Sequence, residues 1–241
     1  MSNLKTSISQ VGGFGTILTI FNLIQRNLTE YKDHYLIPKE FINLLLDNKS
    51  IIENHVYGLQ VTSDLLENEI PLEKKSSAEL LGNLENYLQD IFPYLQAKKL
   101  HLTLPHLKQN YPLYYNEKAV GLLIEELVIN AYKYSPRESS INILAHVNNG
   151  YLSLSVKNDV SKQGILNKEQ EKLVKEPFYR IMPPDVTVAK VEKFSLGLGL
   201  TVADNIMNKH EGLFSIRTMV DHIGNQQSDA VMAELMFPLA K

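Results

Sequence analysis

The chain has 241 residues, of which 44% are hydrophobic and 21% charged, as in an ordinary globular protein. Its net charge of −3, without a basic block, gives no electrostatic footprint for nucleic acid binding. The chain has no cysteine, which excludes disulfides, thiolate metal sites and cysteine nucleophiles and is consistent with a cytoplasmic location. The longest apolar run, residues 12–24, is interrupted by Asn22 and is shorter than the ~20 residues of a membrane helix, so we expect no membrane span.

Two helices are predicted in the first 70 residues. From Thr16 to about Tyr31, apolar residues recur at intervals of three and four. Pro38 is suited to the start of a second helix, which we expect to end at Asn68–Pro71. A seam with alternating steps of four and three follows this second helix: Phe41, Leu45, Asn48, Ile52, His55, Leu59, Thr62 and Leu66. Such a seam is typical of coiled coils and four-helix bundles and predicts pairing with a second copy of the chain.

The remainder of the chain, residues 71–241, is predicted to be a second domain that mixes helices and strands. Apolar periodicity predicts helices over residues 76–97, 116–134 and 200–209. Alternating patterns predict strands over residues 100–104, 141–147, 151–157, 213–219 and 230–236. The turn Asn148-Asn149-Gly150 joins two of these strands as a hairpin. The fold class is therefore α+β, with a helical hairpin followed by an α/β sandwich.

Polar side chains share one face of the helix predicted over residues 116–134, in its last part, which runs from Glu125 toward Pro136. Glu126, Asn130 and Tyr134 recur every four residues, and Lys133 lies beside them. An amide oxygen can ligate Mg²⁺, a lysine can contact a phosphate, and a glutamate can orient an attacking group. Polar residues at helical spacing are also common on solvated faces, so this motif is informative only in combination with others along the chain.

Two further motifs come later in order, Glu176 to Arg180 and Ser195 to Leu200. Together with Glu126 to Ser135, they resemble the F box, the second glycine box and the N box of two-component sensor histidine kinases. The nucleotide-binding domain of these kinases belongs to the wider class that includes gyrase-type and Hsp90-type ATPases. The resemblance covers residues 70 to 241 and extends more loosely over residues 1 to 70.

This resemblance implies an architecture and a set of partners. Residues 1–70 would be the dimerisation and phosphotransfer hairpin, which forms a four-helix bundle in a homodimer. Residues 71–241 would be the ATP-binding catalytic domain, a two-layer α/β sandwich with ATP and Mg²⁺ as cofactors. A response-regulator protein with a receiver domain is the implied partner. The bundle prediction from the seam also allows an ordinary coiled hairpin without this function.

The family roles can be carried over to individual residues of this chain. Asn130 would hold Mg²⁺, Lys133 would contact phosphate, and Tyr134 would lie along the adenine. Glu126 occupies the place of the general base of gyrase-like ATPases, and it can equally be a capping or solvated residue. Arg180 and the glycine segment before the last helix would contact phosphates through Gly197, Leu198 and Gly199.

The sequence departs from the family pattern in its first glycine box. Asn158 stands at the position of the aspartate that accepts the adenine amino proton, and Val160 replaces a glycine. An amide oxygen can still accept this proton, and Asp159 is the second candidate for the role. Ser195 replaces the first glycine of the second box. Residues 181–194 take the place of the mobile ATP lid and are called the lid segment below.

The phosphoacceptor motif is also altered. Gln10 stands where the family has the acceptor histidine, and a glutamine amide is not a nucleophile for phosphoryl transfer. Either the acceptor is lost or replaced, or a different alignment applies; His55, in the seam, fits a structural role better than that of acceptor. The leading hypothesis is a kinase-type enzyme that uses Mg-ATP. The alternatives are a degenerate kinase that serves as a docking scaffold and an ATPase or serine kinase of the same fold.

Overall fold

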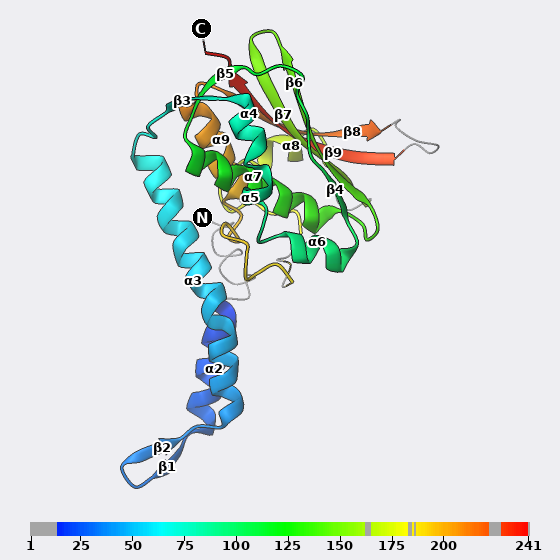
Figure 1. Ribbon diagram of the computed structural model, residues 1–241. Coiled ribbons are helices and arrows are strands. Elements are labelled where there is room, and N and C mark those ends of the chain that lie inside the picture. Colours follow the sequence, from blue (N-terminus) through cyan, green and yellow to red (C-terminus); the bar gives the residue numbers. More distant parts are fainter. Residues whose placement is uncertain (1–13, 162–164, 183–184, 186, 222–227, 241) are drawn as a thin grey trace.

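The structure is a computed structural model that describes residues 14–161, 165–182, 185, 187–221 and 228–240. Gln10, the predicted acceptor position, lies outside these residues. Two long helices, α2 (Phe14–Asn27) and α3 (Lys39–Glu67), extend away from an α/β body (Figure 1). No helix in the described ranges combines the length and the apolar character needed to cross a membrane.

The tip of the helical pair differs from the prediction. The first helix ends at Asn27, before the predicted end near Tyr31, and a ribbon of two antiparallel strands follows it, β1 (Thr29–Tyr31) and β2 (His34–Leu36). The β-branched and aromatic residues of this ribbon favour extended backbone over helix. Lys32 turns the ribbon with a positive φ of 55°. Helix α3 begins directly after Pro38, as the proline predicts.

The helix predicted over residues 76–97 is in fact interrupted. The chain first forms strand β3 (Glu73–Ser76), and the Ser76 side chain then caps the next helix together with Glu79. Pro93 marks a fresh helix start because it lacks the N–H that a helix interior requires. Three short helices result: α4 (Ser77–Gly82), α5 (Leu84–Tyr87) and α6 (Phe92–Lys98). Their apolar residues still point to a shared core, which explains the continuous pattern in the sequence.

A mixed five-stranded sheet forms one layer of the body. Its order is β4 (His101–Thr103), β6 (Ser140–Asn148), β7 (Tyr151–Asp159), β9 (Ser228–Pro238) and β8 (Leu213–Asp221). Strands β4 and β6 are parallel, and the other neighbours are antiparallel. Asn149 and Gly150 both have positive φ, so the predicted hairpin turn between β6 and β7 is present. A separate pair joins β3 to β5 (Pro112–Tyr115).

Helices α7 (Glu117–Tyr134) and α9 (Gly199–Lys209) cover one face of this sheet (Figure 1). Leu123, Ile124 and Leu127 of α7 are buried in the core with Leu154 of β7 and residues of α9. The short helix α8 (Gln170–Leu173) precedes the lid segment. The α/β sandwich predicted for the nucleotide-binding domain is therefore present, and its two covering helices carry the N box and the second glycine box.

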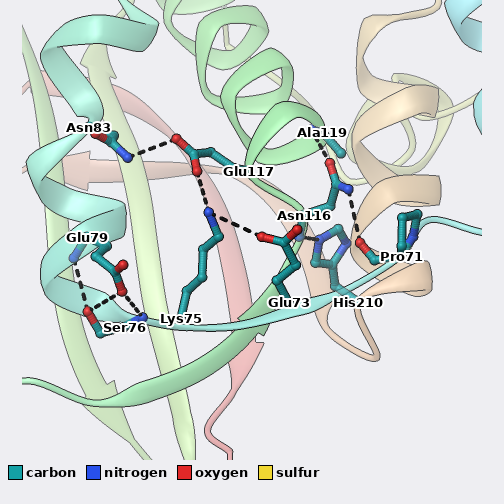
Figure 2. Close-up of polar contacts among 10 residues, drawn as sticks. All are labelled: Pro71, Glu73, Lys75, Ser76, Glu79, Asn83, Asn116, Glu117, Ala119 and His210. Atoms are coloured by element: carbon teal, nitrogen blue, oxygen red, sulfur yellow. Dashed lines mark hydrogen bonds and ion pairs between the residues drawn. The ribbon is translucent and has the colours of Figure 1, made fainter.

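Polar contacts fix the start of α7 (Figure 2). The Asn116 side chain accepts a hydrogen bond from the backbone N–H of Ala119 and caps the helix. Its amide nitrogen donates to the carbonyl of Pro71, at 3.0 Å, in the segment that follows α3. The backbone N–H of Asn116 donates to Nε2 of His210, at 3.0 Å. The N-box helix is thus joined at one point to the end of the hairpin and to the end of α9.

A second cluster beside it is built around Lys75 (Figure 2). The Lys75 ammonium pairs with Glu117 in the first turn of α7 and lies 3.5 Å from Glu73. Asn83 donates to the other oxygen of Glu117, at 3.1 Å. Glu117 also lies in the first turn of α7, where the helix dipole favours a negative charge. These contacts hold α7 in one position, which its functional face requires.

Candidate functional site

The predicted site residues surround a cavity of about 420 Å³ between α7, the start of α9, the end of β7 and the lid segment. The predicted residues that line it are Glu126, Asn130, Lys133, Tyr134, Asn158, Arg180, Gly197 and Gly199. Leu198 does not line this cavity; its side chain is buried in the core. Asp159, the second candidate of the first glycine box, is likewise outside the lining, so Asn158 is the residue that meets the cavity.

Glu126 and Asn130 form a hydrogen-bonded pair on α7. The Asn130 amide nitrogen donates to Oε1 of Glu126, at 2.9 Å. This leaves the amide oxygen of Asn130 as its free acceptor, the atom that a hard cation prefers. Burial raises the pKa of Glu126 to about 7, since the carboxylate is almost completely excluded from water. A carboxyl group with such a pKa can exchange protons near neutral pH.

Lys133 and Arg180 approach one buried carboxylate, that of Glu192 in the lid segment. The Lys133 ammonium lies 2.8 Å from Glu192 Oε1, and Nη2 of Arg180 lies 3.7 Å from the same atom. Burial alone would lower the pKa of Lys133, but Glu192 and Glu126 outweigh burial and raise it. Lys133 is therefore a cation, and in this structure the lid supplies its counterion.

Neighbouring atoms lie so close to the two glycines of the second box that neither position has room for a side chain. Gly197 has a φ of 77°, and a Cβ there would lie 2.9 Å from the carbonyl oxygen of Tyr179. A Cβ on Gly199 would overlap the Glu126 carboxylate. The backbone of the second glycine box therefore packs against the N box. Gly199 begins α9, and no side chain among the described residues caps the helix there, so its first N–H groups can meet an anion.

Helix α3 of the hairpin packs directly on the lid segment. The Asn54 amide donates to the carbonyl oxygen of Lys190, at 2.5 Å, and Gly58 touches the carbonyl of Lys193 so closely that a Cβ would overlap it. His55, predicted as a seam residue, is buried at this contact, and burial lowers its pKa. Lys193 also pairs with Glu125 of α7. The end of the lid segment is thus held between the hairpin and the N-box helix.

Whether a magnesium nucleotide fits can be judged from the residues present. The Nε of Arg180 is buried and has no hydrogen-bond partner among the described residues, as expected of a donor that awaits an anion. The described residues contain no cluster of three or more His, Cys, Asp or Glu that could hold a metal. Mg²⁺ commonly binds through one or two protein oxygens together with substrate phosphates and water. Asn130 and the cationic pair fit this mode.

Sequence reasoning missed two parts of the site. The sequence predicts Glu192 only as part of the lid segment, and nothing in its local sequence points to its pairing with Lys133. The sequence predicts Ser135 only as the end of the N box, yet it receives a hydrogen bond from Asn158. A contact between a helix end and a strand end cannot be read from spacing along the chain.

The sandwich fold and this cavity together define a nucleotide-binding protein of the class to which histidine kinases belong. The sequence model described as "Histidine kinase-, DNA gyrase B-, and HSP90-like ATPase" matches residues 115–237, just over half of the chain, and the chain belongs to this family. The recognition made from the three motifs is confirmed.

Individual relatives extend this result. The Heme sensor protein HssS of Staphylococcus epidermidis is 24% identical over 230 residues, which cover 84% of this chain and 48% of that protein. The chain thus spans about half the length of the curated relatives that it matches. Two solved structures share the fold. ShkA, solved with AMPPNP, has a TM-score of 0.62 at 13% identity and covers 98% of this chain and 44% of that one. The histidine kinase ThkA, solved with the response regulator protein TrrA, has a TM-score of 0.58 at 12% identity over 97% and 58%.

Proposed function

We propose that this protein is a signalling protein of histidine-kinase type. It binds Mg-ATP in the cavity and acts in the transfer of a phosphoryl group from ATP to a response-regulator-type partner. The observation that carries the proposal is the meeting of the N box and the second glycine box around one cavity. There the buried donor Nε of Arg180 has no partner among the described residues. The family membership and the fold shared with ThkA support it.

Different residues of the cavity are proposed to bind the phosphates, the metal ion and the base. Lys133 and Arg180 supply positive charge for phosphates, and the N–H groups at the start of α9 add donors. Asn130 offers its oxygen to Mg²⁺, since its nitrogen is held by Glu126. When bound, the magnesium nucleotide supplies a phosphoryl group whose charge the metal helps to neutralise. Tyr134 and the apolar wall of Val156, Ile216 and Ala233 would enclose the base.

Glu126 is proposed as the residue that handles a proton. Its carboxylate lines the cavity next to Gly199, and its pKa of about 7 lets it accept a proton from an attacking water or hydroxyl group. This feature favours hydrolysis or transfer to a hydroxyl as a second activity of the same site.

Pairing of two chains through the helical hairpin is part of the proposal. Large apolar side chains of both helices are exposed in the single chain, among them Leu18, Phe21, Leu46, Leu59 and Leu66. Leu59 and Leu66 belong to the predicted seam, and a second hairpin would cover them in a four-helix bundle. Light scattering at micromolar concentration tests this pairing: a dimer mass is expected, and a monomer mass would contradict it.

Calorimetry with Mg-ATP tests the nucleotide proposal. Wild type is expected to bind, and Asn130→Ala is expected to lose the metal-dependent part of the affinity, because alanine has no side-chain oxygen for Mg²⁺. Asn142→Ala, near the start of β6 and outside the cavity lining, is the matched control. Labelled ATP incubated with candidate receiver domains then reports hydrolysis, self-labelling and transfer together. No heat with millimolar Mg-ATP would support the docking-scaffold alternative.

A further inference from the structure

Hydrogen bonds connect the end of the N-box helix to the cavity through Ser135. The Ser135 hydroxyl donates to the carbonyl oxygen of Ala131 in the last turn of the helix, at 2.7 Å. A serine hydroxyl has one hydrogen, so this bond leaves its oxygen only as an acceptor. Ser135 is 4% exposed, which prevents water from offering the hydroxyl another partner.

Asn158 at the end of β7 uses that acceptor. Its Nδ2 donates to Ser135 Oγ at 3.2 Å and to the backbone carbonyl of Asp159 at 2.9 Å. Both hydrogens of the amide nitrogen are therefore committed, and Asn158 can offer a ligand only its oxygen. Asn158 lines the cavity and is itself 4% exposed.

Rotating this amide by half a turn is strongly disfavoured. The flip would place the Asn158 oxygen against Ser135 Oγ, whose hydrogen is already bound to Ala131, and against the Asp159 carbonyl. The Asp159 carbonyl would then face another acceptor, and the Ser135 hydroxyl could pair with the amide oxygen only by giving up its bond to Ala131, so two hydrogen bonds would be lost in a buried place. The orientation of Asn158 thus depends on the hydroxyl of Ser135 together with the carbonyl of Asp159.

We infer that Ser135 is a specificity-determining residue of the cavity: it locks Asn158 as a hydrogen-bond acceptor and so selects a purine with an exocyclic amine over one with an oxygen there. This inference rests on the proposed binding of a magnesium nucleotide. Adenine meets the locked acceptor with a donor. Hypoxanthine and guanine carry an oxygen at that position of the ring, which would face the Asn158 oxygen without a shared hydrogen.

The lock is needed because residue 158 is an asparagine. An aspartate at this position would present acceptor oxygens in either orientation and would need no serine to select adenine. An unlocked asparagine can rotate and offer its nitrogen, which accommodates both kinds of base. Ser135 should therefore matter in the native chain and lose its effect on base choice when residue 158 is replaced by aspartate.

The test compares dissociation constants for Mg-ATP and Mg-ITP, which differ in the amine or oxygen at the base. Wild type is expected to prefer ATP by about tenfold or more, since a mispaired buried acceptor costs at least one net hydrogen bond. Ser135→Ala removes one of the two hydrogen bonds that hold the Asn158 amide and is expected to reduce this preference by about three- to tenfold, mainly through tighter ITP binding. Ser139→Ala is the control, because its hydroxyl donates to the carbonyl of Pro136 within an exposed turn and Ser139 does not line the cavity.

Two further measurements keep the inference falsifiable. Ser135→Ala combined with Asn158→Asp is expected to restore the ATP preference. In wild-type protein without nucleotide, the Asn158 side-chain N–H signals, assigned by their loss in Asn158→Asp, are expected to exchange slowly with solvent; fast exchange would contradict the lock even if Ser135→Ala fails to fold. An unchanged ATP to ITP ratio in folded Ser135→Ala would overturn this inference alone. A wild type that binds neither nucleotide would overturn the proposed function and the inference with it.

Discussion

The carboxylate of Glu192 lies 2.8 Å from the ammonium of Lys133, so the lid segment places a negative charge inside the cavity proposed for the nucleotide phosphates. Arg180 shares this counterion at 3.7 Å. Both cations are proposed to bind the phosphates, and both are engaged while Glu192 is in place. Phosphate binding must therefore compete with a residue of the chain itself.

Replacing Glu192 by glutamine should tighten Mg-ATP binding. The competing charge disappears, and we expect the dissociation constant to fall by about five- to tenfold. Without nucleotide, the two cations lose their buried partner, which should lower the free energy of unfolding by about 1 to 3 kcal/mol. Thermal unfolding with and without Mg-ATP measures both effects, because ligand binding adds stability according to its affinity.

Glu169→Gln is the matched control for this experiment, since it makes the same charge change on an exposed residue at the start of α8. It should leave affinity and stability unchanged. An affinity of Glu192→Gln equal to that of wild type would show that Glu192 does not compete with the phosphates.

The contact between α3 and the lid segment can be tested at Gly58. A Cβ at this position would overlap the carbonyl oxygen of Lys193, so Gly58→Val cannot keep the helix and the lid in their present positions. We expect faster amide hydrogen exchange in residues 188–194, by at least about tenfold, because their packing partner moves away. Exchange monitored by mass spectrometry measures this change.

Gly82→Ala is the control for Gly58→Val, since nothing lies within 4 Å of a Cβ built there. It should leave exchange in the lid segment as in wild type and slightly stabilise α4, because alanine favours helix over glycine. Unaltered protection of residues 188–194 in Gly58→Val would mean that the helix and the lid do not depend on each other.

Much of the fold is predictable because its elements follow local rules. The N-box helix has its apolar face against the sheet, Pro38 starts α3, and Asn149-Gly150 closes the β6–β7 hairpin. Each of these depends on residues adjacent in sequence. The start of the helical region at Ser76 was predictable, but its breaks escaped prediction because apolar spacing continues across them; Pro93 accounts for the start of α6, and the spacing gives no sign of the break at Asn83.

The candidate site was predictable in composition and only partly in arrangement. Motif spacing was sufficient to select Glu126, Asn130 and Lys133, which lie on one helix face. The pairing of Lys133 with Glu192 joins residues far apart in sequence, and its strength comes from burial, which sequence spacing does not report. The same holds for the packing of α3 against the lid segment, since the seam of α3 predicts only that its residues are covered.

The hydrogen bond between Asn116 and His210 predicts acid sensitivity (Figure 2). His210 is buried, and burial lowers its pKa below the ordinary value of 6.5. The unfolded chain therefore binds a proton at a pH where the folded protein does not. The contribution of His210 to the free energy of unfolding is fully present above pH 6.5. It is lost as pH falls from there toward the lower pKa of the folded state, by up to about 1.4 kcal/mol per pH unit.

His210→Gln should remove this part of the acid dependence, because an amide oxygen can still accept from Asn116 and does not titrate. Urea unfolding at pH 7.5, 6.5 and 5.5 measures the slope. His55, whose pKa burial also lowers, contributes a slope of the same sign, and Glu126, whose pKa burial raises, contributes one of opposite sign. The expected result is therefore a difference in slope between wild type and variant, not a flat dependence in the variant. His101→Gln, on the exposed end of strand β4, is the control. An identical slope in wild type and His210→Gln would contradict the prediction.

The Glu126 carboxylate is expected to lower the stability of the fold while it supports activity. Its folded pKa of about 7 lies above the ordinary 4.5, so the fold favours the protonated form and loses stability as pH rises from 4.5 through 7. Glu126→Gln mimics the protonated form and can still accept from Asn130. At pH 8 we expect the variant to be more stable than wild type by about 1 to 3 kcal/mol.

The same substitution should remove the proton acceptor. We expect ATP turnover or phosphoryl transfer to fall by about 100-fold or more, and the rise of the wild-type rate through pH 7 to be absent from the variant. Glu169→Gln is the control, because it makes the same change on an exposed carboxylate that does not line the cavity. If Glu126→Gln retains the wild-type rate and pH profile while gaining stability, Glu126 has a structural role only. If turnover falls without any gain in stability at pH 8, the carboxylate is not held in its protonated form by the fold, and its pKa in solution is lower than its burial implies.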